Sequence, residues 1–189
     1  MNVQSNAKIE KIFEATFALI ARNGIHNTPV SAISRKSRVA TGTIYHYFES
    51  KEALINALYL SLKEKMLQAV MAGHDAERGY RAKFFRIWIN YYDYLVDNAE
   101  VLSFVEQCSN TPIITDETQK TADAIVSPLL KFFQEGIKNG ALKQDNVQLI
   151  VSLLHGSVVS LAKLQISGRL DATNEVKQSV AEFCWKGLK

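Results

Sequence analysis

With 189 residues, of which 47% are hydrophobic and 22% charged, the chain has the composition of a soluble globular protein with enough apolar material for a sizeable core. Its two cysteines have no CxxC spacing and suggest no disulfide framework. No uninterrupted apolar run approaches the roughly 18 residues of a membrane span, and the N-terminus lacks the features of a signal peptide, so we expect a cytoplasmic protein without a membrane segment.

The charge excess is confined to the first third of the chain. Residues 1–55 contain seven Lys and Arg against four Asp and Glu, whereas the remainder contains 15 of each sign. This asymmetry is expected if only the N-terminal part meets a polyanion. A net charge of +3 over 55 residues is also found on ordinary protein surfaces.

The first predicted helix covers about residues 7–23, where apolar side chains recur at the spacing of an amphipathic helix. Gly24 should end it, because glycine adopts the left-handed conformation without steric cost. Thr28 and Pro29 predict the start of the next helix, as a capping hydroxyl followed by proline at the first helical position. This short helix is expected to run to about Ser37.

A turn at residues 38–40 separates this helix from a second short one at about 41–48. Ser50 is placed to cap a longer helix that extends to about Val70. A short helix, a tight turn and a second short helix, with longer helices on both sides, predict a helix-turn-helix.

The rest of the chain is expected to be helical after a polar loop at residues 73–79. Because no strand-like alternation extends beyond a few residues, the predicted fold class is all-α. We expect an N-terminal helix-turn-helix three-helix domain over residues 1–50 and a larger helical domain over residues 51–189. The periodicity places helices in the larger domain at about 80–97, 100–109, 116–139, 145–167 and 173–187.

Residues 28–54 resemble the DNA-binding signature of the TetR family of transcriptional regulators. The most specific part is GTIYHYF at residues 42–48, followed by SKEAL at residues 50–54. The close resemblance covers about residues 8–60. It implies a repressor, not an enzyme, that binds palindromic double-stranded operator DNA as a homodimer and is released by a small-molecule effector bound in residues 51–189.

The short helix at 41–48 is the candidate DNA-reading element. Gly42 leaves bare backbone near its start, and the neighbouring hydroxyls suit insertion into the major groove. Core packing is the alternative role for the two tyrosines of this helix, and a solvated surface position is the alternative for Lys51. By resemblance the DNA-binding residues are Thr41 and Tyr45 at the bases, Gly42 at the close approach of the helix to DNA, Thr43 and Tyr47 between bases and phosphates, and Thr28, Ser31 and Lys51 at the DNA backbone.

The sequence departs from the common family pattern around the turn. Arg38 stands where glycine is usual, and a positive φ there would cost arginine about 1–2 kcal/mol, which a phosphate contact could offset. Ala40 stands where a serine usually caps the reading helix, so either Thr41 caps instead or about 1 kcal/mol of capping is lost. Thr41 itself replaces a frequent basic residue. These changes affect individual base contacts rather than the identity of the motif.

Aromatic side chains in the C-terminal part indicate an apolar or aromatic effector. Walls of this kind line ligand pockets, but they also form ordinary cores, and a core or interface position is the alternative for His155. No cofactor is predicted, and no metal site, because the histidines are scattered without partners at metal-ligand spacing. The candidate ligand-binding residues are Trp88, Tyr91, Tyr92, Phe104, Phe132, Phe133 and His155.

The last two long helices carry many small residues, among them Ser152, Gly156 and Ser160, which allow close helix approach. The resemblance implies that these helices form the dimer interface. It also implies that the effector changes the spacing of the two reading helices, with the helix at about 50–70 as the lever. The alternative function is an architectural DNA-binding protein of the same fold without an effector, whereas the motifs of common hydrolases and nucleotide-binding enzymes are absent.

Overall fold

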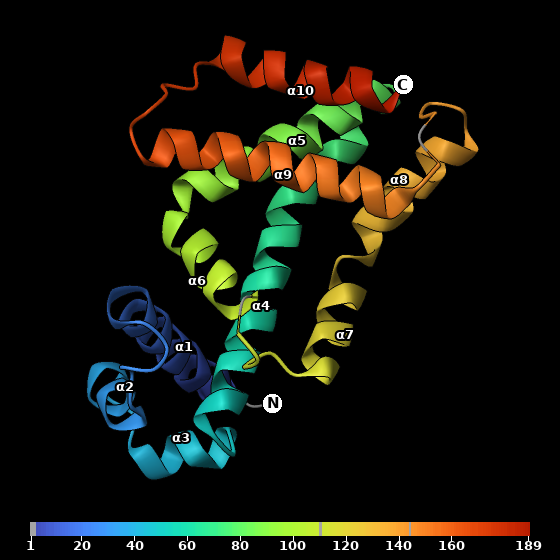
Figure 1. The fold of residues 1–189 in the computed structure, drawn as a ribbon. Coiled ribbons are helices and arrows are strands. Elements are labelled where there is room, and N and C mark those ends of the chain that lie inside the picture. Colours follow the sequence, from blue (N-terminus) through green and yellow to red (C-terminus); the bar gives the residue numbers. More distant parts are fainter. Residues whose placement is uncertain (1–2, 110, 144) are drawn as a thin grey trace. The chain divides into compact units, whose positions relative to one another are not determined.

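The computed structural model of the chain describes residues 3–109, 111–143 and 145–189. The regular elements among these residues are all helical, which confirms the predicted fold class (Figure 1). Close contacts divide the chain into two compact units, which we call unit 1 (residues 1–62 and 100–121) and unit 2 (residues 63–99 and 122–189). The elements are α1 (Val3–Asn23), α2 (Val30–Ser37), α3 (Thr41–Tyr47), α4 (Lys51–Met71), the 3₁₀ turn η1 (His74–Ala76), α5 (Tyr80–Asp97), α6 (Ala99–Ser109), α7 (Asp116–Ile125), α8 (Ser127–Lys138), α9 (Val147–Ile166) and α10 (Asn174–Leu188).

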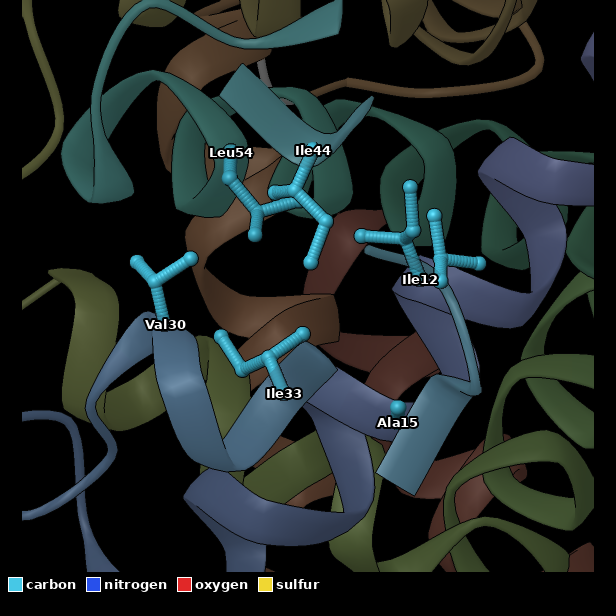
Figure 2. Packing of buried hydrophobic residues seen from close by; sticks show 7 residues of the cluster. Ile12, Ala15, Val30, Ile33, Ile44 and Leu54 are labelled. Atoms are coloured by element: carbon cyan, nitrogen blue, oxygen red, sulfur yellow. The ribbon is translucent and has the colours of Figure 1, made fainter. Parts of the chain in front are cut away.

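The helix-turn-helix is held together by a small apolar core in unit 1. Ile12 and Ala15 of α1 face α2, while Ile44 of α3 and the start of α4 close the cluster from the other side (Figure 2). Ile12 and Ile33 are completely buried, and Ile44 is 1% exposed. Neither short helix would be stable alone at this length, so both depend on burying these branched side chains. The shared core also fixes the angle between the two helices. The full cluster is Ile12, Ala15, Val30, Ile33, Val39, Ile44 and Leu54.

The helix ends of unit 1 confirm two of the predicted caps and correct one. Gly24 ends α1 with a φ of 78°, and the Ser50 hydroxyl accepts the Ala53 amide of α4 at 3.0 Å, both as predicted. The predicted Thr28 cap is wrong. Its hydroxyl donates to the Gly24 carbonyl at 2.9 Å instead, and Pro29 occupies the N-cap of α2 without a side-chain hydrogen bond.

A buried amide ties the segment between α6 and α7 to α4 within unit 1. The Asn56 side chain donates through Nδ2 to the carbonyls of Glu52 at 2.7 Å and Ile113 at 2.8 Å. Its Oδ1 accepts the Thr115 amide at 3.1 Å. All polar atoms of this side chain are therefore used, as a buried amide requires. Residues 100–121 thus belong to the same unit as the helix-turn-helix, despite their distance in sequence.

Unit 2 is built on α5, which packs against α9 and α10 (Figure 1). Its interior is aromatic, with the rings of Trp88 and Tyr92 stacked at 5.8 Å between centroids. The Trp88 indole donates to the Ser157 hydroxyl at 3.1 Å, and the Tyr92 hydroxyl donates to the Gln165 side chain at 2.5 Å. Large rings with satisfied polar tips are characteristic of a well-packed core.

The single helix predicted over residues 116–139 is wrong, because the structure contains two. Helix α7 ends at Ile125 and α8 begins at Ser127, with Val126 as the N-cap of α8. Pro128 lies in the first turn of α8 and has no amide hydrogen for an α-helical bond to Ala124, so α7 cannot continue through it. The sequence contained this signal, but the apolar periodicity on both sides concealed it.

Helix α9 is more apolar than we expected of any segment. It has 20 residues and an 18-residue window of mean hydropathy 1.6, so by length and composition it could cross a membrane. It is not an uninterrupted apolar run in the sequence, because serines, a histidine and a lysine are distributed along it. Only 28% of that window is buried within this chain.

Candidate functional site

Helix α3 has one buried and one exposed face. Ile44 anchors the buried face in the apolar core of unit 1. On the other face Thr41, Gly42 and Tyr45 are exposed, and the Tyr45 side chain is 50% accessible. A helix end that presents small polar groups and bare backbone to solvent, on a rigid support, has the form of a major-groove reading element.

The remaining candidates on α3 are partly packed. Thr43 and Tyr47 are half-buried. The Tyr47 ring lies against Phe48, with 6.4 Å between centroids, and packs against the apolar core of unit 1. The structure therefore gives Tyr47 a packing role, whereas Tyr45 remains outside the core.

The predicted backbone contacts differ in accessibility. Ser31 is exposed on the first turn of α2. Lys51 is half-buried, and its Nζ donates to the Ile25 carbonyl at 2.6 Å, which leaves two further N–H donors on the ammonium. Thr28 is completely buried with its hydroxyl engaged, so we leave it out of the proposed interface.

The turn between α2 and α3 holds Arg38 in the left-handed conformation, with φ 57° and ψ 31°. Among the described residues it is the one non-glycine residue with a positive φ, which costs an arginine about 1 kcal/mol or more. Hydrogen bonds of two serines fix the turn: Ser34 Oγ donates to the Val39 carbonyl at 2.8 Å, and Ser37 Oγ accepts the Val39 amide at 3.3 Å. Ala40 is the N-cap of α3 and provides no capping hydrogen bond, while Thr41 is the first residue of the helix and not its cap, so the missing serine is not replaced.

The predicted ligand-binding residues are not gathered at one place. Trp88 and Tyr92 are completely buried in the core of unit 2, and Phe133 is as well. Tyr91 makes a 2.6 Å hydrogen bond between its hydroxyl and Nδ1 of His155, with the two rings stacked. Phe104 belongs to unit 1, where its ring meets the edge of Phe17 with 5.8 Å between centroids.

A cavity of about 490 Å³ in unit 2 was not expected from the sequence. Tyr80 and Phe132 stack in its wall with 4.5 Å between their centroids, and Lys83, Lys131 and Glu135 supply charges. Burial, assisted by the Glu135 carboxylate, raises the pKa of the Tyr80 phenol above its usual range. Phe132 is the one predicted ligand residue that lines this cavity. The sequence did not reveal it because its walls come from two stretches that are far apart in the chain, residues 71–83 and 128–139.

One side of α9 presents apolar side chains to solvent in the single chain. Leu153 is 51% exposed, and Leu149 and Leu164 are 42% and 37% exposed. Gly156 and Ser160 lie between them on the same face and are also exposed. On α10, Phe183 is 80% exposed. Contiguous apolar exposure of this kind is typical of a protein–protein interface.

The described residues do not contain a group of three or more His, Cys, Asp or Glu side chains that could hold a metal ion. Cys108 is completely buried, and burial raises the pKa of its thiol to about 12, so it is not a reactive thiolate.

Two family models match consecutive parts of the chain. The first, described as bacterial regulatory proteins of the tetR family, matches residues 12–58. The second, described as a tetracyclin repressor-like C-terminal domain, matches residues 59–189. Together they cover both the helix-turn-helix and the helices that follow it.

Two curated proteins are similar over most of their length. An uncharacterized HTH-type transcriptional regulator of Haemophilus influenzae is 23% identical over 180 residues, which is 95% of both chains. The fatty acid metabolism regulator protein of Bacillus subtilis is 29% identical over 175 residues, which is 90% of this chain and 83% of the relative.

Solved structures share the fold. A TetR family transcription regulator from Marinobacter aquaeolei superposes with a TM-score of 0.90 at 20% identity, over 100% of this chain and 98% of that one. The transcriptional regulator FadR from Bacillus subtilis, solved in complex with stearoyl-CoA, has a TM-score of 0.75 at 22% identity, over 95% of this chain and 99% of that one.

Proposed function

Since the chain belongs to the TetR family of bacterial transcriptional regulators, whose members regulate transcription and are not enzymes, we propose that it is a cytoplasmic repressor that binds palindromic operator DNA as a homodimer. The observation that carries this proposal is the exposed face of α3. Ile44 holds the helix on its support, while Thr41, Gly42 and Tyr45 face solvent. Two such helices related by a two-fold axis can read a palindrome, whereas one reaches too few bases for specificity.

We assign the base contacts to Thr41 and Tyr45 and the close backbone approach to Gly42. Ser31 and Lys51 position the sugar–phosphate backbone, the latter through the donors that the Ile25 carbonyl leaves unused. Thr43 and Tyr47 contribute at the edge of this surface, because both are half-buried. Contacts to phosphates orient the protein, and contacts to base edges give the sequence preference.

The direct test is binding of the purified protein to the intergenic DNA upstream of its own gene, compared with a mixed-sequence duplex. We expect Thr41→Ala to change the preference at one or two base pairs by about 1–3 kcal/mol each, measured on a panel of single-base operator variants. The matched control is Thr121→Ala on the exposed side of α7. Equal weakening on every variant would make Thr41 a positioning contact, and failure of the wild type to bind either DNA would refute the repressor.

The dimer is proposed to form through α9 and α10. Leu149, Leu153, Gly156, Ser160 and Leu164 recur at the spacing of one helical face and are exposed in the single chain. The small side chains at positions 156 and 160 allow two backbones to approach, and the leucines supply apolar area. Only 28% of the apolar window of α9 is buried within the single chain. Packing of this face against a second copy of the chain would bury more of this window.

We expect Leu153→Glu to weaken the dimer more than a hundredfold, because two carboxylates would be buried beside the symmetry axis without partners. Analytical ultracentrifugation over a concentration series measures this, and circular dichroism verifies that the helices are retained. Gln134→Glu adds the same charge on an exposed position of α8 and should leave the dimer unchanged. A Leu153→Glu protein with the wild-type dissociation constant would exclude this interface.

For the effector we propose a molecule with a long apolar chain, of the acyl-CoA class. The support is the fatty acid metabolism regulator among the relatives and the stearoyl-CoA bound to FadR. Helix α4 has residues in both units and is the element that would transmit binding to α3. The effector can release DNA only if it binds the two states of the dimer with different affinity.

Adding stearoyl-CoA to the complex with upstream DNA tests this step. Release by stearoyl-CoA but not by free CoA supports the acyl effector. Release by a flat aromatic compound instead would favour an aromatic effector. A complex that none of these compounds affects would favour an architectural DNA-binding protein without an effector.

A further inference from the structure

We propose that Lys11, Lys36 and Arg38 form a second DNA contact, a phosphate-binding pocket beside the reading helix that extends the footprint without reading sequence. This inference rests on the proposed DNA-binding function. The three cations line an open pocket of about 480 Å³ between α1 and the turn after α2. None of them is among the contacts assigned to the reading surface.

The pocket is built for an anion rather than for solvent. All three cations are exposed, and none makes an ion pair with any residue that the structure describes. Glu14 also lines the pocket, but its carboxylate lies beyond ion-pair distance of all three, so the site keeps an excess of two positive charges. An unpaired group of like charges on a folded surface is repulsive and is relieved by a polyanion.

The floor of the pocket consists of small side chains. Ala15 and Ser37 are buried, and Ala18 is half-buried. A phosphate group can therefore approach the surface and meet all three charges. If long apolar side chains lined this pocket, a peptide or a lipid would be the expected ligand instead.

The backbone of Arg38 gives an independent observation. The left-handed conformation would suit glycine or asparagine better, yet the site carries an arginine. The hydrogen bonds of Ser34 and Ser37 hold this turn in place, so the strain is maintained by its surroundings. Because glycine would fit this backbone conformation with less strain, we infer that the positive charge of Arg38 is what the side chain contributes here.

The position of the pocket fits the duplex backbone. Arg38 lies three residues before Thr41, the first residue of α3. When the reading helix of a helix-turn-helix enters the major groove, the first helix of the motif crosses the DNA backbone, and Lys36 lies on that helix, α2. The pocket would then receive a phosphate next to the bases that Thr41 approaches, and not a base.

The test measures affinity for the upstream DNA and for a mixed-sequence duplex of the same length between 50 and 300 mM KCl. For a dimer, each cation removed should lower the slope of log K against log salt by about 1.8 and weaken binding roughly ten- to a hundredfold at 0.1 M salt. Lys11→Gln, Lys36→Gln and Arg38→Gly should show this on both DNAs equally, because phosphates carry no sequence information. Lys120→Gln on α7 is the control for loss of one exposed charge.

Arg38 allows a sharper version. Arg38→Gly should raise the urea midpoint, because the strain disappears, and at the same time weaken DNA binding. Arg38→Lys should keep the salt slope, because the charge remains. Wild-type salt slopes in Arg38→Gly and in the Lys11→Gln/Lys36→Gln double variant would overturn the pocket while leaving the repressor intact. If the wild type binds no DNA, the proposed function fails first, and the pocket with it.

Discussion

Trp88→Ala is expected to lower the free energy of unfolding by about 4 kcal/mol, which is one of the two largest effects that we anticipate. The indole is completely buried, stacks on Tyr92 and donates a hydrogen bond to Ser157. Truncation removes apolar contact, leaves a cavity in the core of unit 2 and deprives the stacked ring of its neighbour. Urea denaturation followed by circular dichroism, at one protein concentration because a dimer is proposed, measures the loss.

The matched variant is Trp88→Phe, which keeps most of the apolar volume but loses the bond to Ser157. It should cost about 1–2 kcal/mol, the size of one buried hydrogen bond with a small packing defect. The comparison separates the two roles open to this residue. A Trp88→Ala protein with nearly wild-type stability but altered response to stearoyl-CoA would make Trp88 a pocket residue and not a core residue.

Ile44→Ala is expected to cost about 3 kcal/mol and to abolish operator binding. Ile44 is the residue by which α3 inserts into the core shared with α1, α2 and α4 (Figure 2). A helix of seven residues is not stable without tertiary packing, so losing this anchor disorders the reading face even where the rest of the chain remains folded.

Ile44→Val retains the branched side chain and should cost only about 1 kcal/mol, with operator binding preserved. Binding assays with both variants, at a temperature where circular dichroism shows each to be folded, separate loss of the reading face from global unfolding. Full operator affinity in a folded Ile44→Ala protein would show that α3 is held by other contacts.

The sequence predicted the helix-turn-helix well because its signals are local. The apolar periodicity within α1, the glycine after α1 and the serine before α4 each act within a few residues of the element they define. The TetR resemblance drawn from residues 28–54 is confirmed by the family models. The sequence marked position 38 as the place where a positive φ would strain an arginine, and the structure has a φ of 57° there.

The predicted Thr28 cap is wrong, and the aromatic ligand-binding residues stay a prediction, for physical reasons of a different kind. Thr28 has the side chain of a helix cap, but a carbonyl one turn earlier was a nearer partner for its hydroxyl. The aromatic residues share a helical period whether they line a pocket or fill a core, and the period does not record which segments meet. Phe104 and Trp88 are both aromatic residues on apolar helix faces in the sequence, yet they belong to different units of the fold. The DNA and ligand contacts themselves remain predictions.

The three hydrogen bonds of Asn56 have a consequence for exchanging parts between related proteins. Two of them connect Ile113 and Thr115 to α4 within unit 1, so the unit that contains the helix-turn-helix is not one continuous stretch of chain. A hybrid that joins this N-terminal segment to a foreign C-terminal domain would keep the Glu52 carbonyl but lose the other two hydrogen-bond partners of this buried amide. Such a transplant has to carry residues 100–121 as well, or a replacement at position 56 that needs no polar partner.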